Sequence, residues 1–326
     1  MTSPDATSFS VVIVNYRVGP MAAGAARSSL TAGASCVHVV DNASGPECRE
    51  VLAPLQAHGI VLHWNTTNVG FGAACNQALA HCQTPYVLLL NPDAELNPAS
   101  AAQAIEAFTH NPSLAAASPT LLDANGHPQR VAQRDPSALN YWADFSLFSS
   151  DRLRKAPTPP VQPPGSAIIT TNWLTGAALW LRRSALLQLP VPGFDPRYFL
   201  YFEDADLCRR LRQQGGLIGH LPHIAPIQHR ARQSSGSSPD AKFRSLVEFF
   251  RSFLLYGEQY EPQHLPRLRR SIRLDMRLRQ AMLLLRLRSP SAAKARLRAY
   301  STIISLTHSS PIPSGEVFPP SPSSST

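Results

Sequence analysis

The sequence predicts an α/β protein with a mostly parallel sheet flanked by helices, followed by a helical C-terminal extension. Three observations support this prediction. Between residues 9 and 110, short apolar runs alternate with helix-like segments, and strands that alternate with helices in this way pair in parallel. Polar residues close the apolar runs, as expected where ligands collect at the carboxyl ends of parallel strands. From residue 243 to residue 288 the pattern is helical.

Each apolar run of the first half has the composition of a buried strand and is followed by a helix signal. The runs are rich in Val, Ile and Leu. Pro at the first turn marks two of the helices, and Asn97 is an N-cap for the later one. The expected strands are Phe9–Tyr16, Cys36–Asn42, Ile60–Trp64 and Tyr86–Asn91, and the expected helices are Met21–Leu30, Pro46–His58, Gly72–Cys82 and Asn97–His110.

The second half is less regular. Residues 121–165 are rich in Pro, Arg and Ser, which favours a long loop over the ligand crevice. A strand-like stretch, Ile168–Leu181, is interrupted at Thr175-Gly176. The expected later helices are Glu203–Gln214, which ends at Gly215-Gly216, then Phe243–Tyr256 and Leu265–Arg288. We therefore expect a catalytic domain over residues 1–232, a helical, Arg-rich extension over 233–310 and a disordered Pro/Ser-rich tail over 311–326.

The net charge of +9 is concentrated in one segment. Residues 1–266 hold 19 basic and 19 acidic residues, whereas residues 267–298 hold 11 basic residues and one acid, Asp275. The expected catalytic domain therefore has no large net positive charge of its own. Nucleic-acid binding by the whole protein is not expected. The five cysteines include no CxxC pair, and no signal peptide or membrane-spanning run is evident, so we expect a cytoplasmic protein with reduced thiols.

Polar residues at the ends of the predicted strands are the first candidates for ligand binding. They are Asn15, Asp41, Asn42, Asn91 and Asp93. A carboxylate at the end of a strand, such as Asp93 in the Asn91-Pro92-Asp93 turn, can hold Mg²⁺ or Mn²⁺ beneath a diphosphate. The same three residues also suit an ordinary turn. The loop Asn68–Gly72 adds two glycines, Gly70 and Gly72, that permit close approach to a ligand, before a helix start that favours phosphate.

Three acids follow one another closely at the start of the helix predicted from Glu203. Glu203, Asp204 and Asp206 complement the helix dipole at this position. Their mutual repulsion also favours a raised pKa in one of them, as a general base requires. His229 lies 25 residues past Asp204, and a single histidine of this kind is either structural or a ligand.

Taken in order, these segments resemble the inverting family 2 glycosyltransferases, and within them the bacterial rhamnosyltransferase-like branch. The resemblance is carried by VVIVNY (11–16), VVDNAS (39–44), NVGFGAACNQAL (68–79), LLLNPDAEL (88–96), WLTGAALWLRRSAL (173–186), GFDPRYFLYFEDADLCRRL (193–211) and His229. It implies a GT-A fold, a nucleoside-diphosphate sugar donor and a divalent cation, Mn²⁺ or Mg²⁺.

The resemblance also implies a role for each site residue. Asn15, Asp41, Asn68, Gly70 and Asn91 would bind the donor, and Asp93 and His229 would bind the metal. Asp204 would be the catalytic base, supported by Glu203, while Trp173, Thr175, Gly176 and Asp206 would bind the acceptor. The sequence departs from the family pattern at Asn91, where Asp is common, and at Arg17, where a small polar residue is commoner.

The resemblance favours dTDP-rhamnose as donor and a saccharide or lipid-linked saccharide as acceptor, in cell-envelope polysaccharide synthesis. Leu265–Arg288 is then interpreted as an amphipathic helix, part of a basic segment (265–298) on an anionic membrane surface at the inner face of the cytoplasmic membrane. A helix packed on the catalytic domain with a solvated Arg face is the other interpretation. The alternative function is a catalytically inactive GT-A-like protein that binds carbohydrate or nucleotide. A nucleotidyltransferase or epimerase would need glycine or basic motifs that the first predicted turn lacks.

Overall fold

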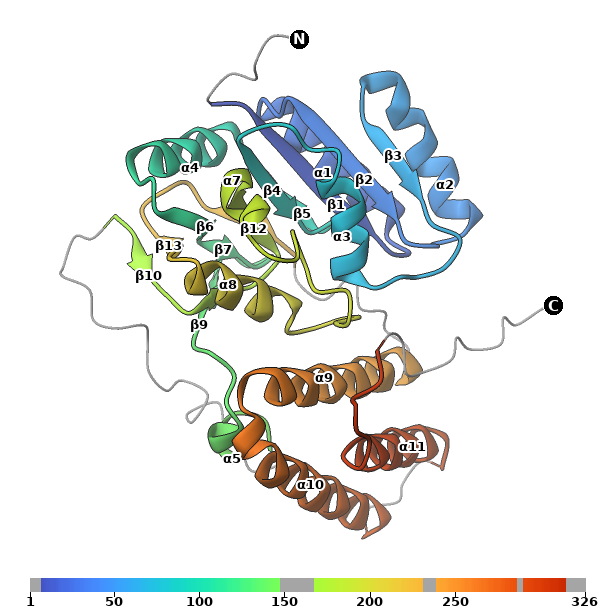
Figure 1. Ribbon diagram of the computed structural model, residues 1–326. Coiled ribbons are helices and arrows are strands. Elements are labelled where there is room, and N and C mark those ends of the chain that lie inside the picture. The colour runs from blue at the N-terminus through green and yellow to red at the C-terminus, as the bar shows by residue number, and fades with distance from the viewer. Residues whose placement is uncertain (1–6, 147–166, 231–238, 286–289, 315–326) are drawn as a thin grey trace. The chain divides into compact units, whose positions relative to one another are not determined.

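The computed structural model describes residues 7–146, 167–230, 239–285 and 290–314 (Figure 1). The described chain forms two compact units. The first comprises residues 7–135, 167–195 and 204–230, and the second comprises residues 136–146, 196–203, 239–285 and 290–314. The chain therefore passes between the units several times rather than once.

An eight-stranded sheet is the centre of the first unit. Its strands lie in the order β10 (Ile169–Thr170), β13 (Leu217–Leu221), β6 (Leu114–Pro119), β12 (Ala178–Arg182), β4 (Tyr86–Leu90), β1 (Phe9–Asn15), β2 (Cys36–Asp41) and β3 (Val61–Trp64). β1 pairs in parallel with β2 and β4, as does β2 with β3. β12 runs antiparallel between β4 and β6. The sheet is mostly parallel, which confirms the predicted fold class.

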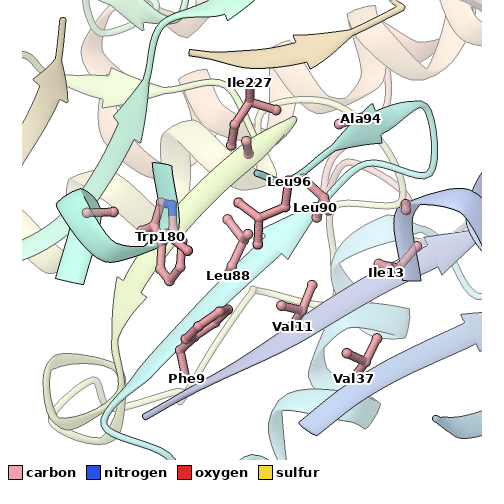
Figure 2. Close-up of a cluster of buried hydrophobic side chains, with 14 of the residues drawn as sticks. Phe9, Val11, Ile13, Val37, Leu88, Leu90, Ala94, Leu96, Trp180 and Ile227 are labelled. Carbon is pink, nitrogen blue, oxygen red and sulfur yellow. The ribbon is translucent and has the colours of Figure 1, made fainter. Parts of the chain in front are cut away.

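Helices cover both faces of this sheet because successive strand residues point to opposite faces. Val11 and Ile13 face a core that includes α1 (Gly19–Thr31), α2 (Pro46–Leu52) and α4 (Pro98–His110). Val12 and Val14 face a core that includes α3 (Phe71–Leu79), α7 (Arg183–Leu187) and α8 (Glu203–Gln213). Figure 2 shows the first core, where the rings of Phe9 and Trp180 lie 5.1 Å apart between centroids.

The segment that was expected to be a loop contributes three strands to two small sheets. One contains β5 (Ala94–Glu95), β14 (Ile227–His229), β7 (Leu121–Leu122) and β8 (Pro128–Gln129), and the other pairs β9 (Ala132–Gln133) with β11 (Trp173–Leu174). The loop prediction is therefore wrong for parts of 121–146, while 147–165 lies outside the described residues. Strands of two residues are too short to show a periodic pattern in the sequence. They form only where a distant strand pairs with them.

Other elements also differ from the prediction for identifiable reasons. β6 (sequence LAAASP) and β13 have few β-branched residues, so their composition gives little strand signal. Pro54 stops α2 early, and a 3₁₀ helix, η1 (Ala53–His58), follows. The stretch Ile168–Leu181 breaks twice, giving β10, β11 and β12.

The second unit is helical around an aromatic core. It contains η2 (Ala138–Asn140), α5 (Tyr141–Asp144), α9 (Pro239–Tyr260), η3 (Pro262–His264), α10 (Leu265–Leu285) and α11 (Pro290–Leu306). α9, α10 and α11 contact one another, as Figure 1 shows. The buried hydroxyl of Tyr141 donates a 2.7 Å hydrogen bond to the Asp275 carboxylate. No helix in the described ranges is both long and apolar enough to cross a bilayer.

A close contact holds the loop before α8 against α3. The Asn76 amide donates to the Phe194 carbonyl and accepts from the Phe194 N–H, both at 2.8 Å. Gly193 lies beside this amide with φ of +82°, and a Cβ there would overlap the Asn76 side-chain oxygen. Only glycine fits both the backbone angle and the space.

We expect Gly193→Ala to destabilise the protein by about 2–5 kcal/mol, the sum of a left-handed alanine and an overpacked contact. Gly126→Ala is the matched control, because Gly126 has φ of +80° with no atom within 4 Å of the added Cβ. The control should lose only about 1–2 kcal/mol. Urea unfolding of both variants measures the difference, and equal losses would contradict the proposed contact with Asn76.

Candidate functional site

The carboxyl ends of β1 and β2 carry a buried hydrogen-bonded network. The Asn15 amide donates to Asp41 Oδ1 at 2.7 Å and to the Ser44 hydroxyl at 3.0 Å. The Ser44 N–H donates to Asp41 Oδ2 at 3.1 Å. Asn15 is fully buried and Asp41 nearly so, and the two residues lie opposite each other in the parallel pairing of β1 with β2. Two of the predicted donor-binding residues are thus fixed in position.

A second network of amides adjoins the first and includes two more predicted donor residues, Asn68 and Gly70. The Asn42 amide donates to Asn68 Oδ1 at 2.7 Å, and the Gly70 N–H donates to the same oxygen at 2.9 Å. Asn65 in turn donates to Asn42 Oδ1 at 3.1 Å. Asn42 followed Asp41 at a strand end but was assigned no role, and Asn65 and Ser44 were missed. Their position directly after a predicted strand was the available signal.

The turns beside these networks carry backbone strain. Arg17 and Ala43 adopt left-handed conformations, with φ of 62° and 64°. The Arg17 N–H donates to the Ser44 hydroxyl at 2.8 Å, which holds one turn against the other. Such conformations cost free energy and persist where the surroundings impose them, often at ligand sites.

The turn after β4 contains Asp93, whose carboxylate is buried without hydrogen-bond donors. The Asn91 N–H donates to the Ala177 carbonyl at 2.8 Å, which ties the end of β4 to the start of β12. Asp93 is 4% exposed, and both of its carboxylate oxygens are buried without a hydrogen-bond donor among the described residues. A buried carboxylate without donors is unfavourable unless a cation pairs with it.

His229 supplies the second part of this site. The antiparallel pairing of β14 with β5 places His229 opposite Ala94, so its Nε2 lies 3.3 Å from Asp93 Oδ1 and 3.3 Å from the Asn91 amide nitrogen. The structure thus brings together the two residues that the resemblance assigned to the metal, Asp93 and His229, with Asn91 beside them, although 136 positions separate Asp93 from His229.

Gln129 on β8 determines which nitrogen of His229 faces Asp93. Its amide nitrogen donates to the His229 carbonyl at 2.6 Å, so its oxygen faces His229 Nδ1 at 2.9 Å and accepts a proton from it. The Nε2 lone pair of neutral His229 is then directed toward the Asp93 side. This is the arrangement of a metal-ligating histidine with a supporting partner. Sequence reasoning missed Gln129, which no local motif marks.

These residues fit a divalent cation. An unpartnered buried carboxylate and an imidazole lone pair face each other at 3.3 Å, near the roughly 3 Å expected between adjacent ligands when each bond is about 2.1 Å. No group of three or more Cys, His, Asp or Glu side chains in the described residues could hold a metal.

Asp204, at the start of α8, is the candidate base. The Gly176 N–H donates to Asp204 Oδ2 at 3.1 Å, and the Ala205 N–H donates to Oδ1 at 2.8 Å. Burial raises the pKa of Asp204 to about 6, although these two N–H groups act in the opposite direction. A pKa near 6 suits a general base at neutral pH.

Phe71 contributes to the surroundings of Asp204. A Cβ built on Gly176 would lie 3.6 Å from the Phe71 ring and 3.9 Å from Asp204 Oδ2. Gly176 therefore leaves a small space in front of the carboxylate, with Phe71 on one side of it. The ring of Phe71 also contacts Phe194 edge-on.

The remaining predicted residues have clear structural partners. The fully buried Asp206 pairs with Arg210 at 2.8 Å, and Arg210 also holds the Val191 and Gly193 carbonyls. The Trp173 indole donates to the Arg134 carbonyl, and the Thr175 N–H donates to the Val131 carbonyl. Acceptor binding by these three residues stays a prediction.

Glu203 opens α8 after two strained residues of the second unit. Tyr201 and Phe202 are left-handed, with φ of 68° and 64°. The Phe202 ring stacks on Phe253 at 5.4 Å and packs against Phe249 at 5.0 Å. Aromatic packing thus fixes the backbone immediately before the acidic residues. The supporting role of Glu203 stays a prediction.

The fold and the site define a nucleotide-sugar-dependent glycosyltransferase with a GT-A fold. The family described as "Glycosyl transferase family 2" matches residues 10–174, about half of the chain. The chain therefore belongs to glycosyl transferase family 2. This confirms the family, the GT-A fold and the enzyme class predicted from the sequence.

Individual relatives add detail about similar proteins. The chain is 29% identical over 197 residues to the N-acetylglucosaminyl-diphospho-decaprenol L-rhamnosyltransferases of two Mycobacterium tuberculosis strains, CDC 1551 / Oshkosh and ATCC 25618 / H37Rv. The alignment covers 53% of this chain and 59% of each relative, so the chain spans less than two thirds of their length. These matches support the rhamnosyltransferase-like branch.

A solved structure resembles the fold. It is a mannosyltransferase from Pyrobaculum calidifontis in complex with GDP-Man and Mn²⁺, with a TM-score of 0.50 and 14% identity. The match covers 92% of this chain and 87% of the other.

We expect kcat/KM to fall about tenfold per pH unit below pH 6, because Asp204 must be ionised to accept a proton. Donor affinity measured over the same pH range separates this effect from a loss of donor or metal binding. Asp204→Asn should abolish transfer at all pH values. A rate that is flat between pH 5 and 7 would contradict the assignment.

Asp204→Asn should also be at least as stable as the wild type at pH 7.5. The raised pKa means that the native state binds a proton more tightly than the unfolded chain, so stability from Asp204 is full below about pH 4 and is lost as the pH rises through about 6. Unfolding in urea at pH 7.5 checks that lost activity is not lost folding.

We expect Gln129→Met to lower Mn²⁺ affinity 10–100-fold, because the His229 ring loses the partner that orients it. Gln133→Met is the matched control, since Gln133 is also a glutamine in a two-residue strand but does not contact His229. Calorimetric titration of Mn²⁺ in the presence of a nucleoside diphosphate measures both. Equal affinities in the two variants would refute the role of Gln129.

Proposed function

We propose that this enzyme is an inverting rhamnosyltransferase that transfers a sugar from dTDP-rhamnose to a saccharide or lipid-linked saccharide acceptor in cell-envelope polysaccharide synthesis. The observation that carries the proposal is the presence of two sites beside the paired ends of β4 and β12. Asp204 has the pKa of a base, and Asp93 with His229 has the form of a cation site. One side of the reaction removes a proton, and the other neutralises a leaving group.

In this mechanism the donor nucleotide lies over the two amide networks. Asn15, Asp41, Asn68 and Gly70 hold the base and ribose, and Asn91 lies beside the diphosphate. Asp93 and His229 bind the divalent cation, Mn²⁺ or Mg²⁺, which when bound neutralises charge on the departing diphosphate. At position 91 this chain has Asn where the family commonly has Asp. The proposed cation site therefore has one fewer negative charge.

On the acceptor side, Asp204 accepts the proton from the attacking sugar hydroxyl. Direct attack needs only this base and no covalent nucleophile, so the configuration of the transferred sugar inverts. The Gly176 N–H orients one carboxylate oxygen, which leaves the other lone pairs for the hydroxyl. The small space at Gly176 suits a sugar ring close to the base.

The choice of donor and acceptor rests on the curated relatives, whose name specifies a decaprenol-linked acceptor and L-rhamnose. A lipid-linked acceptor would place the enzyme in the cytoplasm at the inner face of the membrane, bound peripherally. The cation is supported by the Mn²⁺ in the similar mannosyltransferase as well as by the Asp93–His229 pair.

The proposal predicts a metal-dependent thermal shift with dTDP-rhamnose and not with UDP- or GDP-sugars. A ligand at 100 times its Kd adds about 2.7 kcal/mol of stability. Asp93→Asn should lose the metal dependence because one ligand is removed. A shift with another donor class would reject dTDP-rhamnose. Binding of the donor without any transfer to an acceptor extract would favour an inactive carbohydrate- or nucleotide-binding protein.

A further inference from the structure

α10 has a buried inner face and an exposed outer face, and its arginines differ in their bonding between the two. Its inner face is buried and includes Leu268, Ile272 and Met276, each 0% exposed. Its one acid, Asp275, is also 0% exposed and is bonded to Tyr141 and Arg279. The outer face therefore carries no negative charge from this helix.

The arginines at the border of the buried face are bonded within the second unit. Arg269 donates to the Ser309 carbonyl at 2.8 Å and approaches Glu258. Arg273 bonds Thr307, and Arg279 bonds Asp275. These three side chains hold α10 to its neighbours.

The outer residues form one stripe along α10, which we call the outer stripe. Its members are all exposed and recur every three or four residues: Arg267, Arg270, Leu274, Arg277, Ala281 and Leu284. This spacing places them on one side of a helix. The stripe extends about 25 Å at 1.5 Å per residue.

The composition of the outer stripe is unusual for a solvated surface. Leu274 and Leu284 are 52% and 56% exposed, while the three arginines make no hydrogen bond or ion pair with any described residue. Apolar side chains interleaved with unpaired cations suit an interface that is anionic at its surface and apolar just below it.

We propose that the outer stripe of α10 binds the surface of an anionic lipid bilayer, with Arg267, Arg270 and Arg277 among the headgroups and Leu274 and Leu284 inserted beneath them. This deepens the proposed function by naming the surface that would bring the enzyme to a lipid-linked acceptor, and it rests on that function only in this respect. A nucleic acid would accept the arginines but offers no apolar partner for the leucines. A second copy of the stripe would be repelled by its like charge.

Vesicle co-sedimentation of the full chain tests the arginines. Wild-type protein should bind vesicles of equal parts phosphatidylglycerol and phosphatidylcholine, and not vesicles of phosphatidylcholine alone. Arg270→Gln/Arg277→Gln should lower the partition coefficient about 30-fold. The matched control, Arg27→Gln/Arg49→Gln, removes two exposed arginines of the first unit and should bind as wild type. Equal binding by the two double variants would overturn the proposal.

A second pair tests insertion. Leu274→Ser/Leu284→Ser should weaken binding to the anionic vesicles at least tenfold, whereas Leu139→Ser/Leu187→Ser, which alters leucines 50% and 55% exposed elsewhere, should not. Unchanged binding by the first pair would overturn insertion. Duplex DNA binding that depends on Arg270 and Arg277, without vesicle binding, would assign the stripe to nucleic acid instead. Circular dichroism confirms that each variant is folded.

The two proposals fail in different ways. Transfer to a detergent-dispersed acceptor should be the same in the Arg270→Gln/Arg277→Gln variant and the wild type, because neither side chain belongs to the catalytic unit. Vesicle binding without sugar transfer would reject the proposed function and keep the outer stripe. Transfer without vesicle binding would reject the outer stripe and keep the function.

Discussion

The antiparallel pairing of β12 with β4 is the constraint on which the site depends. Residues Ala178–Arg182 lie opposite Tyr86–Leu90 in register, and the ladder continues at its end with the bond from the Asn91 N–H to the Ala177 carbonyl. The residue before Ala177 is Gly176, whose N–H binds Asp204. Two residues after Asn91 comes Asp93. One strand pair therefore fixes both the candidate base and the candidate cation site, and a one-residue slip would turn every side chain of β12 to the other face.

The two carboxylates of the candidate site, Asp93 and Asp204, are buried in different surroundings. Asp93 is surrounded closely and lacks donors, so it is stabilised when a cation is present. Asp204 has two N–H donors, yet burial still raises its pKa to about 6. Each is unfavourable for folding by itself and is maintained by the packed sheet around it. Sites of this kind commonly trade stability for activity.

The helical second unit contains a buried aromatic cluster and an exposed stripe of arginines and leucines on α10. Its aromatic cluster fixes the left-handed pair Tyr201–Phe202 that leads into α8. Within α10, arginines beside the buried face are bonded to protein oxygens, whereas those of the outer stripe are not. Charge count alone could not distinguish these two groups, because both repeat along the same helix.

The sequence by itself determined the parallel α/β architecture, since apolar runs and capping signals act locally, and it placed Asn15, Asp41, Asn91 and Asp93 at strand ends. It also predicted a base among Glu203, Asp204 and Asp206, because acids crowded at a helix start are visible in a few consecutive residues. Only the tertiary structure decided the rest. Strands of two and three residues, which no local pattern marks, place His229 beside Asp93 and Gln129 beside His229. Asp206 is paired with Arg210 one helical turn later. The physical reason is that pairing between segments far apart in the chain sets these contacts, so no short stretch of the sequence indicates them.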